Sequence, residues 1–438
     1  MNGTPLTALT GRLFDGHALH PRATLLIQGN KVLEVTTQDI TSEAQVIHLN
    51  PDETLLPGLA DLHVHTRPWY AAWFLEAGIT TVRDAGGPLN ALKEQHQWAA
   101  QGIGPRVFGA AVMLDSENSF FRNFGPEAFT PIGNFNAASW AINTPEQAIQ
   151  AVNVLADNGA DTIKLYEQLS PDVYAAAVQQ AKERGLDVMT DLGMGMTRAL
   201  NGATVDALQA LKLGVRTIEH ASGFMLAFQR MGFNLPTDFP SEAVLEQFAQ
   251  AVVEANTILI PTLSVMEALR HDKRAPLTRL PAGQHDNETM TSLKQQWDAA
   301  HAHTSKNRAL VEWDARFAAA LAERILKLGG QVGAGTDTPA GADNLPGGGL
   351  HAELEYLVKN ANFSPIQALQ AATGSANKIV GGGRGILAPN SVADAVIVRV
   401  DPTRDITATR NIQQVMFNGQ FLDNLNSTFM AHVRLPRA

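Results

Sequence analysis

The sequence predicts an α/β fold: a (β/α)8 TIM barrel that carries a small β-sandwich domain formed by both chain termini. Two observations predict it. Short β-rich runs alternate with amphipathic helical stretches through the middle of the chain, and hairpin patterns occur at both ends. The length of 438 residues agrees with one large barrel and an addition to it, because domains average roughly 150 residues.

Both ends of the chain carry short β patterns. Residues 24–35 contain two β-rich runs around Gly29-Asn30, a pair that suits a tight turn because both residues tolerate positive φ. Residues 393–400 read as a buried strand, and residues 415–421 form a second hairpin on Asn418-Gly419.

Neither end carries a cluster of chemically active residues, so we expect the two ends to fold together into one β domain. The expected limits are 1–57 and 385–438 for this domain and 58–384 for the barrel. Two separate hairpins packed on the core are the alternative.

Eight β runs predict the barrel, and a helical stretch follows most of them. The expected strands are Leu59–His65, Ile79–Asp84, Arg106–Val112, Thr162–Tyr166, Asp187–Leu192, Thr217–Ala221, Thr257–Leu263 and Val332–Asp337. Among the expected helices are Pro171–Arg184, Val205–Leu213 and Ser241–Ala255. A doubly wound open sheet is the alternative, but no strand is followed by a glycine-rich phosphate-binding motif.

Two connections are longer than ordinary loops, and long barrel loops usually cover the active end. The first, Met113–Thr144, is rich in aromatic residues: Phe120, Phe121, Phe124, Phe129, Phe135 and Trp140. The second, Ser264–Ser305, is polar and contains His271, His285, His301 and His303.

The composition excludes several functional classes. The net charge of −10 disfavours nucleic-acid and anionic-membrane partners, because both require a basic patch. The absence of cysteine excludes disulfides, thiolate zinc sites, iron–sulfur clusters and cysteine nucleophiles. No apolar run is long enough for a membrane span, and the first residues lack a signal-peptide pattern. We expect a cytoplasmic enzyme that acts on a small-molecule substrate and forms a homo-oligomer.

The strongest chemical pattern is His63-x-His65 at the end of the first expected barrel strand. Residues i and i+2 of a strand point to the same face, so both imidazoles face the barrel axis and favour a divalent metal. Asp337 ends the eighth strand, where a carboxylate can bind a metal and accept a proton.

Two further residues end strands at the same side of the barrel. His220 ends the sixth strand and is a third candidate imidazole ligand. Lys164 lies at the end of the fourth strand, where addition of CO₂ would turn it into a carbamate, an anionic ligand able to bridge two metals. A lysine that points outwards or forms an ion pair is the alternative.

These residues and their surroundings resemble the amidohydrolase superfamily, and most closely its imidazolonepropionase-like and Xaa-Pro dipeptidase-like members. The resemblance covers nearly the whole chain through LLPGLADLHVHT, GITTVRDAGG, GADTIKLY, TIEHASG, GAGTDTP and SPIQALQAATGSANKIVG. It implies two divalent metal ions, zinc or else manganese. It further implies one ion held by His63, His65 and Asp337, one held by His220, and an N6-carboxylated Lys164 as the bridge.

One position departs from the family. Asp191 stands where the fifth strand of the family usually carries a histidine. Three interpretations remain open: Asp191 binds the second metal through oxygen, the second site is empty or weak, or activity is lost. The charges of two divalent ions would be balanced by a carbamate, two aspartates and a hydroxide, so the site would be neutral. The Asp191 carboxylate, in place of a neutral histidine, would favour manganese over zinc.

The function that the sequence predicts is hydrolysis of an amide-like C–N bond by metal-activated hydroxide, with Asp337 as the general base. Dipeptides, N-acyl amino acids, carbamates and aryl amides are candidate substrates. The alternatives are hydrolysis of a cyclic amide, an ester or a lactone, and a single-metal or binding-only protein. Tyr166 and His351 are candidate substrate-binding residues, although packing or a surface role explains them equally well.

Overall fold

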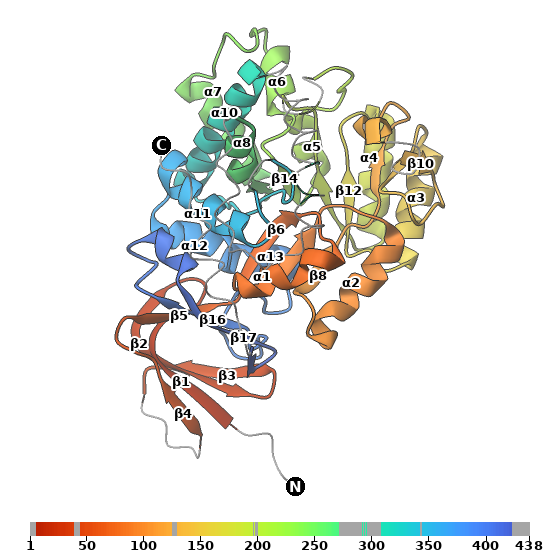
Figure 1. Ribbon diagram of the computed structural model, residues 1–438. Coiled ribbons are helices and arrows are strands. Elements are labelled where there is room, and N and C mark those ends of the chain that lie inside the picture. The colour runs from red at the N-terminus through yellow and green to blue at the C-terminus, as the bar shows by residue number, and fades with distance from the viewer. Residues whose placement is uncertain are drawn as a thin grey trace.

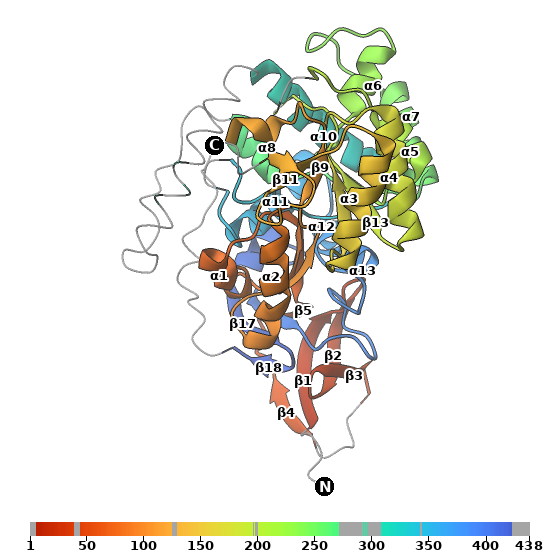
Figure 2. The ribbon, with the colours of Figure 1, turned by 90° about the vertical axis from the view of Figure 1, so that its right-hand side faces the viewer.

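The computed structural model describes residues 6–38, 44–124, 129–195, 197, 200–270, 291, 293, 295, 308–341 and 344–422. These residues form a mixed α/β fold with a large helix-rich part around parallel strands and a smaller part, built on one sheet, below it (Figure 1). In the view turned by 90°, the strands from the N-terminal end again extend below the helix-rich part (Figure 2). Within the ranges described, no helix combines the length and the apolar character that crossing a membrane requires.

The sheet of the smaller part contains strands from both chain ends, red and blue in Figure 1. Its strands are β1 (Leu6–Phe14), β2 (Leu19–Gln28), β3 (Lys31–Thr36), β4 (Gln45–His48), β5 (Glu53–Pro57), β16 (Ala395–Arg399), β17 (Ile412–Phe417) and β18 (Gln420–Phe421). They follow the order β18-β17-β16-β5-β1-β2-β3, and β4 pairs with β1. Antiparallel pairing of β16 with β5 joins the two ends, which supports the expectation of one shared β domain.

The two predicted hairpins are present. The pairing of β2 with β3 extends to Gln28, which lies opposite Lys31. Gly29 in the turn between them has φ 59°. Strands β17 and β18 are joined through Asn418 and Gly419, both at positive φ, as a two-residue hairpin turn requires.

The larger part contains two sheets whose neighbouring strands are all parallel. The first has the order β6-β7-β8, with β6 (Leu59–Val64), β7 (Ile79–Asp84) and β8 (Arg106–Gly109). The second has the order β10-β11-β9-β12-β13-β14-β15, with β9 (Met113–Asp115), β10 (Phe129–Pro131), β11 (Ser139–Ala141), β12 (Thr162–Leu165), β13 (Asp187–Thr190), β14 (Thr217–Glu219) and β15 (Ile258–Ile260).

The eighth expected strand, Val332–Asp337, together with Thr338 forms a segment, residues 332–338, that connects these two sheets. Val332 forms a parallel bridge with Leu259 of β15, and Thr338 forms one with Val64 of β6. Between the bridges, the Leu62 amide donates to the Ala334 carbonyl at 2.9 Å. The segment therefore runs beside β6 and carries Asp337 to the end of that strand.

Helices follow most of the parallel strands. They are α1 (Ala71–Glu76), α2 (Leu89–Gln101), α3 (Pro145–Asp157), α4 (Pro171–Glu183), α5 (Ala207–Leu213), α6 (Phe224–Arg230), α7 (Glu242–Glu254), α8 (Leu263–Arg270), α10 (Arg308–Lys327), α11 (Gly348–Asn360), α12 (Pro365–Ala371) and α13 (Gly374–Val380). Short 3₁₀ helices are η1 (Pro68–Tyr70), η2 (Phe120–Phe124) and η5 (Ile406–Arg410).

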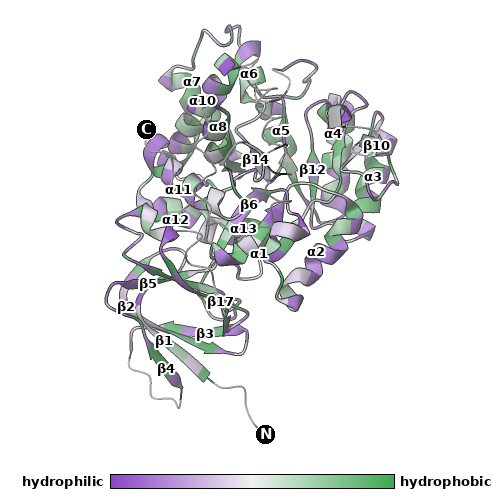
Figure 3. Cartoon of the chain, viewed as in Figure 1, coloured by the Kyte–Doolittle hydropathy of each residue, from purple (hydrophilic) through white to green (hydrophobic). Residues whose placement is uncertain are grey.

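The helices bury one apolar face, as their sequences predict. Helix α2 buries Leu89, Leu92 and Trp98, and hydrophilic residues alternate with these along it (Figure 3). Helix α5 begins at an Asp206 capping box and ends at Gly214 in the left-handed conformation.

The long aromatic connection departs from the expectation of a loop. Residues 113–144 contain three short strands, β9, β10 and β11, which extend the second parallel sheet. Strands of three residues are too short to show a two-residue hydrophobic period, so the sequence pattern does not reveal them. In the second connection, α8 occupies the beginning, and His271, His285, His301 and His303 lie outside the described residues.

Candidate metal centre

The candidate ligands lie where the parallel strands of the larger part end. His63 is in β6, Lys164 is in β12 and Asp337 is in the 332–338 segment. His65, Asp191 and His220 directly follow β6, β13 and β14. Their ligand atoms form two groups that share His63, and within each group all atoms lie within 4.8 Å of one another. The groups are His63 with His65 and Asp337, and His63 with Asp191 and His220.

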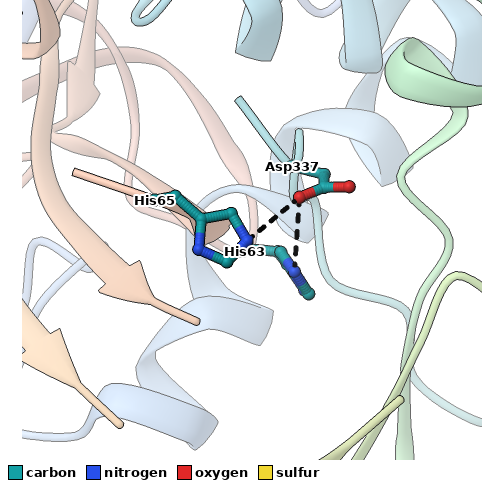
Figure 4. A group of neighbouring side chains, drawn as sticks. All are labelled: His63, His65 and Asp337. Carbon is teal, nitrogen blue, oxygen red and sulfur yellow. Dashed lines mark ion pairs between the residues drawn. The ribbon is translucent and has the colours of Figure 1, made fainter. Parts of the chain in front are cut away.

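Asp337 is the centre of the first group (Figure 4). Its Oδ1 lies 3.3 Å from His65 Nε2 and 3.7 Å from His63 Nε2. The His65 side chain is 24 % exposed, whereas the other two side chains are buried, so the group opens to solvent on the His65 side.

Each of the three histidines is held at its Nδ1 atom. His63 Nδ1 contacts Glu219 Oε2 at 2.6 Å, His65 Nδ1 contacts the Gly86 carbonyl at 3.0 Å, and His220 Nδ1 contacts Thr262 Oγ1 at 2.6 Å. A carbonyl or carboxylate oxygen only accepts hydrogen bonds, so Nδ1 of His63 and of His65 carries the proton. The neutral rings then present the lone pair of Nε2 to the aspartates.

This arrangement fits a cation. The Nε2 lone pair of His65 faces an Asp337 oxygen, and two hydrogen-bond acceptors at 3.3 Å repel each other unless a positive charge lies between them. A proton is one such charge: although burial opposes it, the hydrogen bond and charge of Asp337 raise the pKa of His65. A divalent ion is the other, and two imidazoles with one carboxylate are a donor set that zinc and manganese accept.

The second group contains a side-chain cation of its own. Lys164 Nζ lies 2.7 Å from Asp191 Oδ2, and His220 Nε2 lies 3.2 Å from Asp191 Oδ1. All three side chains are at least 95 % buried. Although burial alone would raise the pKa of Asp191, His220 and Lys164 outweigh it and hold that pKa well below its usual value, so Asp191 is ionised.

Two of the candidate ligands adopt an unusual backbone conformation. His220 has φ 60° and Asp337 has φ 57°, in the left-handed region that few residues other than glycine occupy. Because strand geometry ends at such a residue, β14 stops at Glu219, earlier than the sequence predicts. Backbone strain of this kind is concentrated at functional sites.

The structure places Tyr166 beside the aromatic connection. Its ring centroid lies 4.9 Å from that of Phe121, and the residue is buried. Burial, followed by the charges of Glu167, Asp191 and Asp337, raises the pKa of Tyr166 well above its usual value. The phenol therefore stays protonated and able to donate a hydrogen bond.

His351 has other partners. It lies in α11, fully buried, with Nδ1 3.0 Å from Thr409 Oγ1 and Nε2 3.1 Å from the Ala77 carbonyl. Burial, assisted by the positive charge of Arg410, lowers the pKa of His351 to about 3, so the ring is neutral. These contacts favour a structural role, and contact of His351 with substrate stays a prediction.

Sequence reasoning missed the residues behind the ligands. Glu219 contacts His63, and Arg83 NH2 lies 2.8 Å from both Glu219 carboxylate oxygens. A charged residue within an apolar strand, as in ITTVRD and TIEH, is the pattern that could have found them.

The comparisons with known proteins agree with this arrangement. The sequence model of the amidohydrolase family matches residues 54–422, which include every candidate ligand. A search of curated protein sequences finds no match.

Solved structures share the fold over nearly the full chain. A Xaa-Pro dipeptidase with bound methionine in the active site is 20 % identical with a TM-score of 0.69, covering 96 % of this chain and 100 % of that one. An Aspergillus niger ochratoxinase is 20 % identical with a TM-score of 0.70, covering 96 % of each chain. A putative prolidase from Bifidobacterium longum is 21 % identical with a TM-score of 0.68, covering 96 % and 95 %.

Proposed function

Because this chain belongs to the amidohydrolase family and is therefore a metal-dependent hydrolase, we propose that it cleaves an amide-like C–N bond in a small molecule. The observation that carries the proposal is the convergence of Nε2 atoms of His63, His65 and His220 on two buried carboxylates. A divalent ion bound among these atoms polarises a carbonyl group and lowers the pKa of water.

The proposed ligand set holds two divalent ions, zinc or else manganese. His63, His65 and Asp337 hold the first ion. Asp191 and His220 hold the second, with Lys164 contributing as an N6-carboxylated side chain. The contact between Lys164 and Asp191 favours a competing arrangement, in which the ammonium group neutralises Asp191 and only the first ion binds.

Asp337 is proposed as the general base. Burial raises its pKa, but where the neighbouring histidines carry protons, the hydrogen bond of His65 and the charges of the three rings outweigh burial and lower the pKa of Asp337 below its usual value. The group is then ionised at neutral pH and can accept the proton of an attacking water. Returning this proton to the leaving nitrogen completes cleavage of the C–N bond.

Tyr166 is proposed to bind substrate. Its protonated hydroxyl can donate a hydrogen bond to a substrate carbonyl or carboxylate, and the Phe121 ring beside it provides an apolar contact. A substrate with an apolar or aromatic group near the scissile bond fits this pair. Dipeptides, N-acyl amino acids, carbamates and aryl amides meet that description, as do some cyclic amides, esters and lactones. The fold shared with the Xaa-Pro dipeptidase and the ochratoxinase supports testing dipeptides and aromatic acyl amides first.

The scaffold for this site is proposed to be one closed (β/α)8 barrel, residues 58–384, with a terminal β-sandwich of residues 1–57 and 385–438. The bridges of residues 332–338 to both parallel sheets support closure on one side. On the other side, the Asp161 amide donates to the Gly109 carbonyl at 2.9 Å, between the end of β8 and the start of β12.

Metal analysis of the purified protein, followed by a substrate screen, tests the proposal. We expect bound zinc or manganese and hydrolysis of at least one N-acyl amino acid, dipeptide or aryl carbamate, abolished by chelation and restored by metal. A chelated protein that hydrolyses its substrate at the original rate would exclude the proposed mechanism.

A further inference from the structure

Three barrel strands contribute one buried chain of charged groups behind the metal centre. Arg83 comes from β7, Glu219 from β14 and His63 from β6, and each side chain is at most 1 % exposed. Strands β7 and β14 belong to different sheets, so the pair of Arg83 and Glu219 links the two sheets through the interior.

The guanidinium group of Arg83 fixes the carboxylate of Glu219. Arg83 NH2 donates to both oxygens of Glu219 at 2.8 Å, NH1 donates to Thr217 Oγ1 at 2.8 Å, and Nε donates to the Leu62 carbonyl at 2.6 Å. An arginine engaged along its whole planar edge leaves its carboxylate partner little freedom to rotate.

Glu219 in turn distinguishes His63 from the other two histidines. His63 Nδ1 faces a carboxylate, whereas His65 faces a carbonyl and His220 a hydroxyl, which are uncharged acceptors. A carboxylate behind an imidazole fixes its tautomer and makes the opposite nitrogen a stronger electron donor. His63 is also the one residue that both candidate ligand groups contain.

We infer that Glu219, oriented by Arg83, is a positioning residue that sets the metal affinity of the centre through His63. The inference rests on the proposed metal site. A structural alternative exists, because a buried ion pair between two sheets also holds strands together, and removing one partner of such a pair destabilises a protein.

Glu219→Gln tests the inference, and Glu353→Gln is its matched control. Glu353 is also a fully buried carboxylate, but it accepts hydrogen bonds from Ser264 and Leu263 and not from a candidate ligand. We expect Glu219→Gln to weaken zinc binding by roughly 10- to 100-fold in a competition titration with a chelator. It should also shift the visible absorption bands of the cobalt-loaded protein. Glu353→Gln should leave both measurements at the parental value.

A double variant separates metal affinity from folding. Glu219→Gln alone leaves the charge of Arg83 buried without its partner, and the protein could then fail to fold. The double variant, Arg83→Gln with Glu219→Gln, removes both charges and avoids this problem. We expect the double variant to bind zinc as weakly as Glu219→Gln. Parental zinc affinity and parental cobalt bands in a folded Glu219→Gln or double variant would overturn the inference, even if the melting temperature falls. Absence of metal binding by the parent protein would overturn the proposed function as well.

Discussion

The two groups of the metal centre balance their charges differently. Around Asp337, the facing atoms are imidazole lone pairs, so the carboxylate needs a proton or a metal ion for a partner. Around Asp191, the ammonium group of Lys164 is already in place at 2.7 Å. The first group therefore depends on a metal more strongly than the second, and we expect the first to have the higher affinity.

The largest effect is expected from Asp337→Ala. The change removes both a proposed ligand and the proposed base, and loss of a general base alone costs roughly 100- to 10,000-fold in rate. Steady-state kinetics and metal analysis measure the loss of activity and of metal. Asp172→Ala, which removes an exposed carboxylate on α4, is the control. His63→Ala and His65→Ala should likewise abolish turnover in a folded protein. Turnover retained by metal-depleted Asp337→Ala would refute the assignment.

The second expected effect concerns Lys164 and CO₂. If Lys164 becomes a carbamate, metal-free protein should bind about two zinc ions in bicarbonate buffer and about one in CO₂-free buffer. Lys164→Met should bind about one ion in either buffer, because it cannot form a carbamate. Equal zinc binding by the parent protein with and without bicarbonate would instead favour the ion pair with Asp191 as the working state.

A third, smaller effect is expected from Asp191→His. A neutral imidazole in place of a carboxylate leaves more positive charge at the centre, so the attacking water should lose its proton more readily. The acid limb of the pH–rate profile should then move to lower pH, with metal content kept. Asp191→Asn, which removes the charge without supplying an imidazole, serves as the comparison. An acid limb that stays in place in Asp191→His would show that Asp191 does not influence the attacking water.

The smallest effect is expected from Tyr166→Phe. The change removes one hydroxyl and keeps the ring against Phe121, so kcat/KM should fall by about 2- to 12-fold, the value of one hydrogen bond. His351→Gln should leave kcat/KM unchanged if His351 only supports the packing of α11, and melting curves should report its effect on stability. A fall in kcat/KM of more than about 100-fold for Tyr166→Phe would mean that the Tyr166 hydroxyl takes part in the chemical step and does not only bind substrate.

Much of this arrangement could be predicted from the sequence, because the ligands sit at strand ends. Strand periodicity locates β6, β12 and β14. His63 and Lys164 each lie one residue before the end of their strand, and His220 directly follows β14. Glycine and asparagine at hairpin turns likewise locate the terminal strands, since few residues tolerate positive φ.

The remainder depends on contacts between distant segments. Arg83 and Glu219 are 136 residues apart, so no local pattern indicates that they pair. The same holds for His351, whose partners Thr409 and Ala77 lie 58 and 274 residues away. Positive φ at His220 and Asp337 also follows from tertiary packing, because neither residue type demands it.

Metal content of the parent protein and of Asp191→Ala tests the central claim, that two unequal metal sites lie side by side, one at His63, His65 and Asp337 and the other at Asp191 and His220. We predict about two ions per chain in the parent and about one in Asp191→Ala, with the remaining ion the tighter of the two. An unchanged metal content after Asp191→Ala would contradict the claim and leave a single site at His63, His65 and Asp337.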